Sequence, residues 1–333
     1  MPAAATTEER TMKAIVNRKY GSPDELKLEE IDKPAPADDE VLVRVRAASV
    51  NPLDWHFMRG LPYLGRPMLG LRKPKRPILG VDAAGQVEAV GKNVTQFRPG
   101  DEVVGAGRSG SAAEYTCGSE KDFAPKSASL SFEQAAAIPI AGVTALQALR
   151  DQGRLQPAQS VLINGAAGGV GTFAVQIAKA LGGDVTGVCS TRNIDLVRSL
   201  GADQVVDYTG EDFAQSGRRY DLVLDLVSNR SLSDLRRALS PKGTLVLSGG
   251  GGGRLLGPLP LILGALVRSP FVSQRMLTFL AKVHRESLVD LMELIEAGKV
   301  TPVIDRTYPL SEAPAAIRYL EAGHARGKVI ITV

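Results

Sequence analysis

Residues 161–181 read Val-Leu-Ile-Asn-Gly-Ala-Ala-Gly-Gly-Val-Gly-Thr-Phe-Ala-Val-Gln-Ile-Ala-Lys-Ala-Leu. The apolar run at the start predicts a buried strand, and the glycine cluster after it predicts a tight turn. Apolar residues then recur at helical spacing, at Val170, Phe173, Ala174, Ile177, Ala178 and Leu181. The pair Gly182-Gly183 ends this helix, and a second strand follows over 184–189. The stretch therefore predicts a strand-helix-strand unit.

A glycine-rich turn between a strand and a helix suits the pyrophosphate of a dinucleotide. Glycines let the backbone approach the phosphates, and the free amides and positive dipole end of the helix face the negative charge. The residues expected to line the phosphates are Gly165, Ala167, Gly168, Gly169, Val170 and Gly171. An isolated glycine cluster is equally typical of an ordinary turn, so the complete strand-helix-strand unit carries the inference.

The end of the second strand distinguishes the two nicotinamide dinucleotides. A site that prefers NAD usually has an Asp or Glu there, which binds the ribose hydroxyls. This chain has Ser190, Thr191, Arg192 and Asn193 instead. Hydroxyls and a guanidinium are donors suited to a 2′-phosphate, so the corner favours NADPH, although Arg192 is also explained as a solvated cation at a helix start. Tyr208 is a candidate to cover the adenine.

Length and charge suit a two-domain enzyme that acts on a small molecule. A chain of 333 residues is too long for one typical core. Its net charge of +4 comes from basic and acidic residues that are interleaved, so no nucleic-acid surface is expected. The one dense basic run, at 72–76, lies among prolines and glycines, and a solvated loop is the simpler interpretation than a binding patch.

Targeting and membrane signals are weak. Residues 1–11 carry no apolar stretch typical of a secretory signal and are expected to form a flexible tail. The longest apolar stretch, 255–267, is shorter than the ~20 residues of a membrane helix, and we interpret it as a lid or a subunit contact. Two scattered cysteines, Cys117 and Cys189, suggest no disulfide framework. We therefore expect no membrane span and a cytoplasmic location.

The chain divides into three parts by its pattern. Residues 12–131 alternate short strands with turns and are expected to be mostly β. Residues 132–280 alternate strands with helices, which predicts a doubly wound parallel sheet of the Rossmann type. Its expected strands are 161–164, 185–189, 204–207, 221–227 and 244–248. Residues 281–333 contain two helices, near 286–297 and 313–321, and a final strand at 328–333 that returns to the first domain.

These stretches together resemble a known family, the zinc-independent, quinone-oxidoreductase-like branch of the medium-chain dehydrogenase/reductase superfamily. The matching stretches, in order, are Val50-Asn51-Pro52-Leu53-Asp54, residues 80–85, Gly100-Asp101-Glu102-Val103, residues 141–145, the glycine-rich turn, Leu200-Gly201-Ala202-Asp203 and Gly327-Lys328-Val329. The resemblance covers nearly the whole chain from residue 12. It implies an α/β protein with a GroES-like β-rich catalytic domain, a Rossmann domain and assembly as a homodimer.

The same resemblance implies that no catalytic metal is bound. At the three positions where zinc-dependent relatives carry ligands, this chain has Asn51, Val81 and Ala141, which replace no thiolate or imidazole. Reduction of a plain ketone gains most from a Lewis acid, whereas a quinone or enone spreads the negative charge itself. We therefore expect hydride transfer from NADPH to a quinone or an α,β-unsaturated carbonyl. An NAD(P)-dependent alcohol or aldehyde oxidoreductase, or an NADPH-binding, redox-responsive interaction protein with little turnover, stays open.

Catalytic roles follow from the resemblance. It places Asn51 near the nicotinamide as a donor to the substrate oxygen, with Asp54 orienting its loop, although a structural turn before Pro52 explains both as well. His56 lies where some relatives have a tyrosine and is a candidate proton donor, against the simpler interpretation of a structural histidine. Tyr63 is a further candidate donor, with packing as its alternative role.

Four more residues are expected on the cofactor side. The resemblance places Thr144 at the start of a helix beside the nicotinamide and phosphates. Val227 is expected to flank the adenine ribose, and Ser248 and Gly249, at the carboxyl end of a strand, to lie by the nicotinamide. The glycine run 249–253 is interpreted either as a loose loop or as a hinge that approaches the cofactor.

Overall fold

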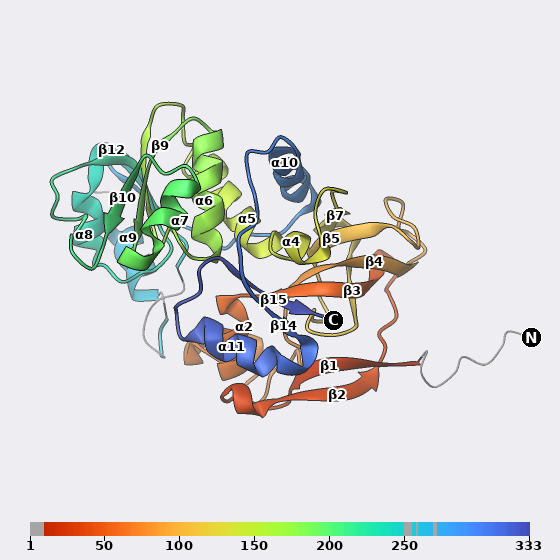
Figure 1. The fold of residues 1–333 in the computed structure, drawn as a ribbon. Helices are drawn as coiled ribbons and strands as arrows, with labels where there is room; N and C mark the ends of the chain where they lie inside the picture. The colour runs from red at the N-terminus through yellow and green to blue at the C-terminus, as the bar shows by residue number, and fades with distance from the viewer. Residues whose placement is uncertain (1–9, 250–254, 258, 269–271) are drawn as a thin grey trace, which may run out of the picture. The chain divides into compact units, whose positions relative to one another are not determined.

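A computed structural model describes residues 10–249, 255–257, 259–268 and 272–333. The chain forms two compact units. Unit 1 comprises Met1–Ile140, Val283–Met292 and Ile304–Val333, and unit 2 comprises Ala141–Lys282 and Glu293–Val303. Each unit is built around its own sheet (Figure 1). The expected α/β class, with a β-rich first part and a Rossmann-like parallel sheet, is confirmed.

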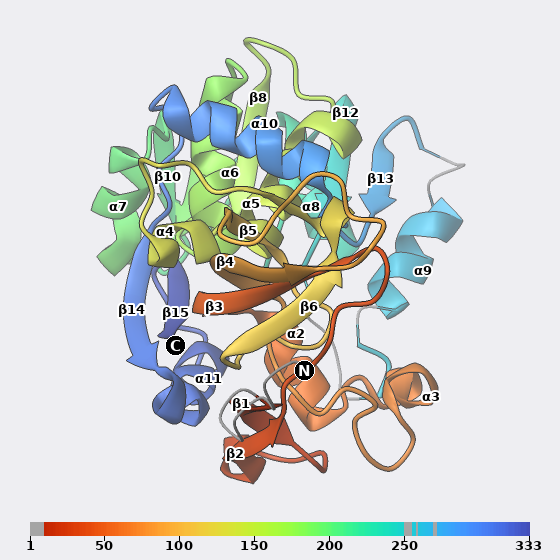
Figure 2. The same cartoon turned by 90° about the vertical axis from the view of Figure 1, so that its right-hand side faces the viewer.

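Unit 1 is mostly β. Its strands are β1 (Thr11–Asn17), β2 (Leu26–Asp32), β3 (Glu40–Val50), β4 (Asp82–Val90), β5 (Glu102–Ala106), β6 (Tyr115–Ser119), β7 (Phe123–Pro125), β14 (Ile304–Pro309) and β15 (Lys328–Thr332). Seven of them form a sheet in the order β14-β15-β3-β4-β5-β7, with β6 paired to β3, and β1 pairs with β2 (Figure 2). The last strand, β15, is antiparallel to β3. The C-terminal segment therefore completes the first sheet.

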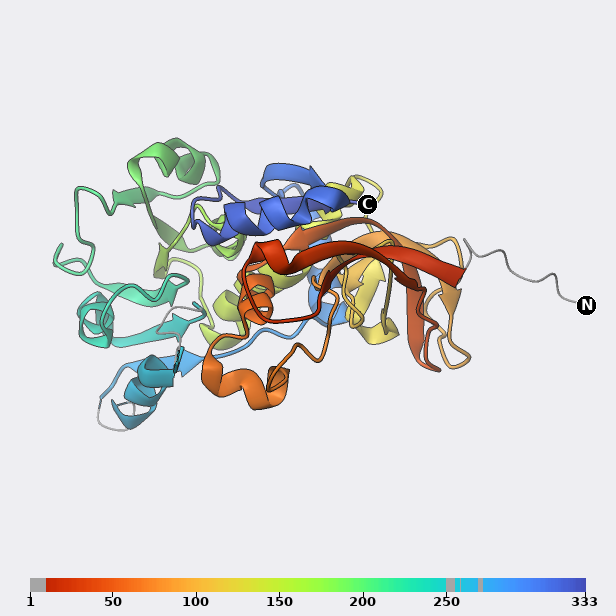
Figure 3. The ribbon, with the colours of Figure 1, turned by 90° about the horizontal axis from the view of Figure 1, so that it is seen from below.

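The described residues of unit 1 also include the helices α2 (Pro52–Arg59), α3 (Arg66–Leu69), α4 (Phe132–Ala136) and α11 (Ala313–Glu321). The core between sheet and helices includes Met58 from α2, Ile317 from α11 and Val329 from β15, all buried. Helix α11 lies beside the β1–β2 hairpin (Figure 3), where Arg318 pairs with Asp24. This core fixes α2, the helix that carries Asp54 and His56 and begins directly after Asn51.

Unit 2 has a parallel sheet of six strands. They are β8 (Ser160–Asn164), β9 (Asp184–Cys189), β10 (Gln204–Asp207), β11 (Tyr220–Asp225), β12 (Leu239–Leu247) and β13 (Arg275–Thr278). Their order is β10-β9-β8-β11-β12-β13, so the direction of winding changes between β8 and β11. Such a switch point is where doubly wound sheets bind their ligands.

The helices of unit 2 connect its strands. They are α6 (Gly169–Ala180), α7 (Ile194–Ser199), α8 (Leu232–Arg237) and α9 (Leu259–Arg268), while α5 (Pro139–Leu146) and α10 (Arg285–Glu296) run across the unit boundaries. Helix α9 occupies most of the apolar stretch that we interpreted as a lid or a subunit contact. Leu261 and Ala265 from this helix pack into the core of unit 2, while Leu263 is exposed.

Among the described residues, no helix is both long and apolar enough to cross a membrane. Cys117 and Cys189 are both buried and unpaired. Burial raises the pKa of the Cys117 thiol to about 12 and that of Cys189 to about 11. Neither thiol is a reactive group at neutral pH.

Candidate active site

The glycine-rich turn joins β8 to α6 and is held against the neighbouring strand. The amides of Gly165 and Ala166 donate to the carbonyl of Val188 in β9, at 3.2 and 3.0 Å. Gly165 has a φ of +91°, a conformation that side chains other than glycine rarely adopt. At Gly171 an added Cβ would lie 2.1 Å from the carbonyl oxygen of Gly165. The tight path of the turn therefore requires glycine at both positions.

Gly168 differs from the other glycines of the turn. An added Cβ there would meet nothing closer than the carbonyl oxygen of Gly165, at 3.4 Å. The residue is the N-cap of α6, whose first amides have no partner within the helix. Open space beside free amides at the positive end of a helix fits a diphosphate group. The turn thus has the features that a dinucleotide requires.

A buried polar pair marks the switch point between β8 and β11. Asn164 ends β8 and donates to the carboxylate of Asp225, which ends β11, at 2.8 Å. The same carboxylate oxygen, Oδ1, accepts the amides of Val227 and Ser228, each at 3.2 Å. Its second oxygen, Oδ2, is buried and has no hydrogen-bond partner among the described residues. The pair fixes the turn that exposes Val227.

The corner after β9 is built by side-chain hydrogen bonds. Asn193 donates to the hydroxyl of Ser190 at 3.2 Å. Thr191 donates to the carboxylate of Asp207, the last residue of β10, at 2.5 Å. Hydrogen bonds from Thr191 and Thr209 lower the pKa of Asp207, so it is ionised at neutral pH. The corner therefore has exposed Arg192 and a carboxylate from the adjacent strand, which we did not predict.

The remaining residues expected at the cofactor lie in different surroundings. Tyr208 is exposed directly after β10, and Thr144 is buried within α5. Ser248 donates its amide to the carbonyl of Asp225 at 3.0 Å, which places it at the switch point. An added Cβ at Gly249 would meet the hydroxyl of Ser228 at 2.5 Å. The rest of the expected glycine hinge, 250–253, lies outside the described residues.

In unit 1, two of the four expected catalytic residues meet at the start of α2. Asn51 is the N-cap of the helix, and Pro52 is its first residue. The backbone amide of Asn51 donates to the side-chain carboxyl group of Asp54 at 2.7 Å. Asn51 is 3% exposed and Asp54 is 2% exposed. Asp54 therefore fixes the backbone at Asn51 and stabilises the helix start.

The side chain of Asn51 is fixed by two charged residues from other elements. Lys328, the first residue of β15, places its Nζ 2.6 Å from Asn51 Oδ1. Asn51 Nδ2 donates to Asp82 Oδ2, in β4, at 2.8 Å. Because Lys328 bonds the oxygen and Asp82 accepts from the nitrogen, the orientation of the amide is determined. These contacts use the oxygen and one of the two amide protons of Asn51.

Asp82 is the centre of this cluster. Its Oδ2 also accepts from the hydroxyl of Ser49 at 2.6 Å and lies 3.4 Å from Lys328 Nζ, while Oδ1 accepts the amide of Ile140 at 2.9 Å. The side chain of Asp82 is fully buried, and that of Lys328 is 2% exposed. A buried carboxylate needs such a set of donors to offset the loss of its hydration.

Burial shifts the pKa of two groups in the cluster. Burial raises the pKa of Asp54 to about 7, and the nearby charge of Asp82 adds to this effect. Asp54 also lines a small cavity beside Ile15 and Leu79, which explains why it is poorly solvated. Burial lowers the pKa of Lys328, whereas Asp82 and Asp54 oppose that shift. The cluster is therefore sensitive to pH near neutrality through Asp54.

His56 and Tyr63 are not part of this cluster. The ring of His56 stacks on Trp55, with centroids 3.7 Å apart, and its buried Nδ1 has no hydrogen-bond partner among the described residues. Burial lowers the pKa of His56, so the ring is neutral at pH 7. Tyr63 is half exposed, and the guanidinium of Arg66 lies 4.7 Å from the centre of its ring.

The described residues include no group of three or more His, Cys, Asp or Glu side chains placed to hold a metal ion. At the sequence position of a ligand in zinc-dependent relatives, the structure has the amide of Asn51, bonded to Lys328 and Asp82. A cation in this place would face the amino group of Lys328. The donor set therefore does not fit a metal and suits an arrangement of hydrogen-bond donors.

Sequence reasoning missed Asp82 and Lys328 as site residues. Both lie in stretches that carry the family resemblance, and this was the only signal in the sequence for their importance. It also missed Asp225, which has no glycine or motif around it that marks it. Each of these three residues contacts residues on other elements of its own unit. Such contacts cannot be predicted from the spacing of residues along the sequence.

Comparisons with known proteins agree with this architecture. Residues 37–145 match a family model described as alcohol dehydrogenase GroES-like domain, and residues 200–331 match one described as zinc-binding dehydrogenase. The chain is 36% identical to a quinone-oxidoreductase QR1, chloroplastic, from Triphysaria versicolor, over 92% of this chain and 93% of the relative. It is 34% identical to an NADPH-dependent alkenal/one oxidoreductase, chloroplastic, from Arabidopsis thaliana, over 97% of this chain and 80% of that protein.

A solved structure gives the same result. The quinone oxidoreductase from Coxiella burnetii superposes with a TM-score of 0.85 at 32% identity and covers 97% of this chain and all of that one. Similarity of this extent in both sequence and fold establishes common descent. The chain belongs to the medium-chain dehydrogenase/reductase superfamily of oxidoreductases, in its quinone-oxidoreductase-like branch.

Proposed function

We propose that this protein transfers a hydride from NADPH to a quinone or an α,β-unsaturated carbonyl without a catalytic metal. The observation that carries the proposal is the buried cluster of Asn51, Asp82 and Lys328, in which the side-chain amide of Asn51 is oriented by two charged residues. The resemblance implies that zinc-dependent relatives have a metal ligand at this position. The names of relatives that act as quinone or alkenal/one oxidoreductases support the same acceptor class. A reductase that uses hydrogen-bond donors suits acceptors that delocalise negative charge.

The residues of unit 2 fit a nicotinamide dinucleotide. Gly168, Gly169 and Val170 would hold the pyrophosphate through their amides, because the turn leaves open space at Gly168. Asp225 and Asn164 would hold the Val227 turn at the ribose. The bound reduced nicotinamide supplies the hydride, which is two electrons and one hydrogen nucleus.

The residues of unit 1 would stabilise the acceptor. Addition of a hydride to a quinone or enone leaves an oxyanion, and one further proton completes a hydroquinone or a saturated carbonyl. The uncommitted amide proton of Asn51 would donate to that oxygen. Lys328 and Asp82 would prevent the amide from rotating and presenting its own oxygen, which would repel the developing charge.

The preference for NADPH depends on the corner after β9. Ser190 and Arg192 supply donors for a 2′-phosphate, and no acidic residue ends β9. Asp207 opposes this preference, because its ionised carboxylate belongs to the neighbouring strand. Thr191 and Thr209 hydrogen-bond that carboxylate and reduce its effect. On balance the corner favours NADPH over NADH.

The test is a panel of acceptors with the purified protein, in parallel samples treated with a chelator and supplemented with zinc. We expect NADPH oxidation with a benzoquinone or an enone in the chelated sample and slower oxidation with NADH. An alcohol and NADP⁺ should give little reaction. Turnover only with zinc would refute the metal-free site. Tight NADPH binding without turnover on any acceptor would instead support an interaction protein.

Assembly and location are part of the same proposal. We infer a homodimer, as the resemblance implies, and a cytoplasmic protein, because both described cysteines are unpaired. The named relatives include chloroplastic proteins, so sedimentation of the purified protein and fractionation of its cells are the measurements that decide these two points.

A further inference from the structure

The segment after α2 exposes large apolar side chains. It contains a short 3-10 helix, η2 (Tyr63–Gly65), followed by α3. Leu64 is 57% exposed, Met68 is 81% exposed and Leu71 is 71% exposed. Leu64 lies in η2 and Met68 lies in α3, which follows it directly. A cluster of exposed apolar residues of this kind commonly marks an interaction surface.

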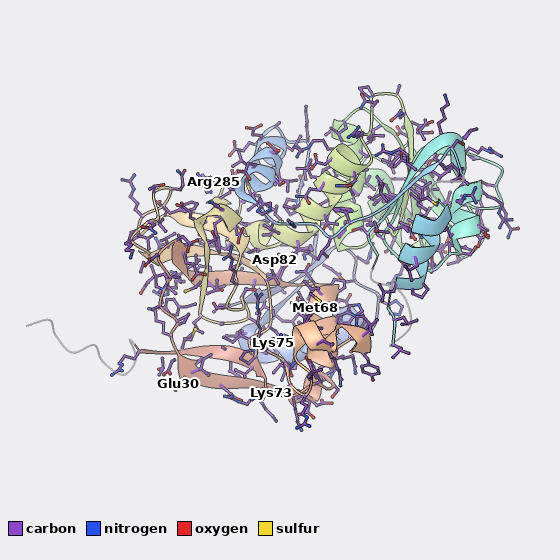
Figure 4. The ribbon with its side chains drawn as sticks, turned by 180° about the vertical axis from the view of Figure 1, so that it is seen from behind. Glu30, Met68, Lys73, Lys75, Asp82 and Arg285 are labelled. Carbon is purple, nitrogen blue, oxygen red and sulfur yellow. The ribbon has the colours of Figure 1, made fainter. Side chains whose placement is uncertain are left out.

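The same segment is strongly basic. Arg66, Arg72, Lys73, Lys75 and Arg76 occur within it, and no Asp or Glu occurs anywhere from residue 55 to residue 81. Residues 72, 73, 75 and 76 are exposed, and none forms an ion pair with a carboxylate in the part of the chain that the structure describes. Met68, Lys73 and Lys75 gather around α3 (Figure 4). Exposed apolar side chains and exposed cations thus occur on one segment, whose exposed surface we call the basic-apolar surface (residues 63–76).

This surface has a defined shape. The amide of Lys75 donates to the carbonyl of Leu69 at 2.8 Å, and its Nζ reaches the carbonyl of Pro67 at 3.3 Å, so the basic loop folds back on α3. The hydroxyl of Tyr20 donates to the carbonyl of Gly70 at 2.7 Å. Gly70 has a φ of +123°, which allows the sharp reversal after α3. These hydrogen bonds tie the basic loop to α3 and to Tyr20.

We propose that the basic-apolar surface docks on an anionic lipid bilayer. Lysine and arginine are attracted to the negative headgroups, while leucine and methionine side chains insert at the boundary of the acyl chains. A nucleic acid would pair with the cations but would leave Leu64, Met68 and Leu71 exposed to water. A second copy of this chain would bring like charges together if the same surface met itself. The bilayer satisfies both parts of the surface.

Docking would bring the protein to the phase in which apolar acceptors dissolve. The proposal does not depend on the acceptor, because it concerns binding to lipid and is measured without turnover. It also differs from the expectation that residues 72–76 form a simple solvated loop. The hydrogen bonds that Tyr20 and Lys75 make with this segment lie within unit 1.

The test is co-sedimentation of the full-length protein with vesicles of phosphatidylcholine, with and without phosphatidylglycerol. We expect binding only to the phosphatidylglycerol vesicles, weakened by salt. The double change Arg72→Glu and Lys73→Glu should weaken binding by about 25-fold or more, at about fivefold for each charge lost. A matched control, Lys242→Glu with Lys299→Glu, makes the same change in net charge at exposed positions of unit 2 and should leave binding nearly unchanged.

The apolar part has its own control. Met68→Ser should weaken vesicle binding by at least about fivefold, because an inserted side chain is lost. Leu280→Ser removes a side chain that is equally exposed, at 84%, and should have no effect. Unchanged melting temperatures show that each variant is folded. The proposal is overturned if the wild type does not sediment with anionic vesicles, if both charge variants lose binding equally, or if Met68→Ser changes the oligomeric state while vesicle binding is absent.

Discussion

The amino group of Lys328 lies 2.6 Å from the side-chain oxygen of Asn51, although the two residues are 277 positions apart. The contact joins the first residue of β15 to the N-cap residue of α2. The antiparallel pairing of β15 with β3, in which Val329 lies opposite Val50, brings these two residues together. A site of this kind forms only when the C-terminal strand is in place. The stability of unit 1 and the orientation of Asn51 are therefore linked.

This link predicts the effect of removing the lysine. Lys328→Met should lower the free energy of unfolding by about 3–5 kcal/mol, because the buried carboxylate of Asp82 loses its charged neighbour. Adding Asp82→Asn should cost much less than the sum of the two single changes, since both partners are then uncharged. Urea unfolding measures both effects.

The exposed pair of Lys92 and Asp38 is the control for this experiment. Its side chains are 73% and 62% exposed. Lys92→Met should change the unfolding free energy by less than about 1 kcal/mol. The claim that Lys328 and Asp82 stabilise each other would be contradicted if Lys328→Met and Lys92→Met lowered the unfolding free energy equally. It would also be contradicted if the effects of Lys328→Met and Asp82→Asn were fully additive.

Two alanine substitutions separate folding from cofactor binding in the glycine-rich turn. Gly171→Ala places a Cβ 2.1 Å from a backbone oxygen and should strongly destabilise unit 2. Gly168→Ala meets only a contact at 3.4 Å and has an ordinary φ of −80°, so the melting temperature should change little. Its methyl group would occupy the space proposed for the phosphates, and the Kd for NADPH should rise. Normal NADPH binding by a folded Gly168→Ala variant would place the phosphates elsewhere.

The raised pKa of Asp54 predicts a pH dependence of stability. The pKa of Asp54 is raised from its ordinary value of 3.8 to about 7 in the folded protein. At a pH between these two values, the folded state holds a proton that the unfolded state has released. The stability of the wild type relative to Asp54→Asn should therefore fall as the pH rises from about 5 to about 7, and level off above it. Chemical unfolding of both proteins across this range measures the difference. A difference that grows with pH would show that the buried carboxylate is stabilised in its charged form.

Arg192 tests the choice of cofactor. Arg192→Ala should raise the KM for NADPH by roughly tenfold to a hundredfold, the range for the loss of one charged hydrogen bond, and leave the KM for NADH unchanged. Asp207→Asn is a companion change, because it removes the opposing charge and should strengthen NADPH binding. If Arg192→Ala affects both dinucleotides equally, the arginine does not contact the 2′-phosphate.

Local patterns predicted most of the elements. The helix expected at 313–321 is α11 with the same bounds, because its apolar spacing and Pro314 mark it clearly. Strand β11 ends at Asp225 and not at 227, because the Asp225 carboxylate takes the amides of the two residues that follow Leu226. Strand β12 begins at Leu239 and not at 244, because Leu239 pairs with Tyr220 of β11 before an irregularity in the register. Strand β13 was missed because four residues give too little pattern.

The site was less predictable than the fold. The glycine-rich turn is visible in sequence because its chemistry is local and because Gly165 and Gly171 each have a steric reason. Lys328 and Asp82 are not visible, since a lysine at the start of a strand ordinarily suggests a solvated end. Their role depends on pairing across β15, β3 and β4, which the sequence does not specify by spacing.

Hydride transfer itself is tested most directly with NADPH carrying deuterium at either face of C4. Single-turnover oxidation would be followed with chelator-treated protein and the best acceptor of the panel. The account predicts that one of the two deuterated forms, and only one, slows the reaction, because the cofactor is held in a single orientation. Equal rates for both forms and for unlabelled NADPH, or no oxidation without added metal, would contradict it.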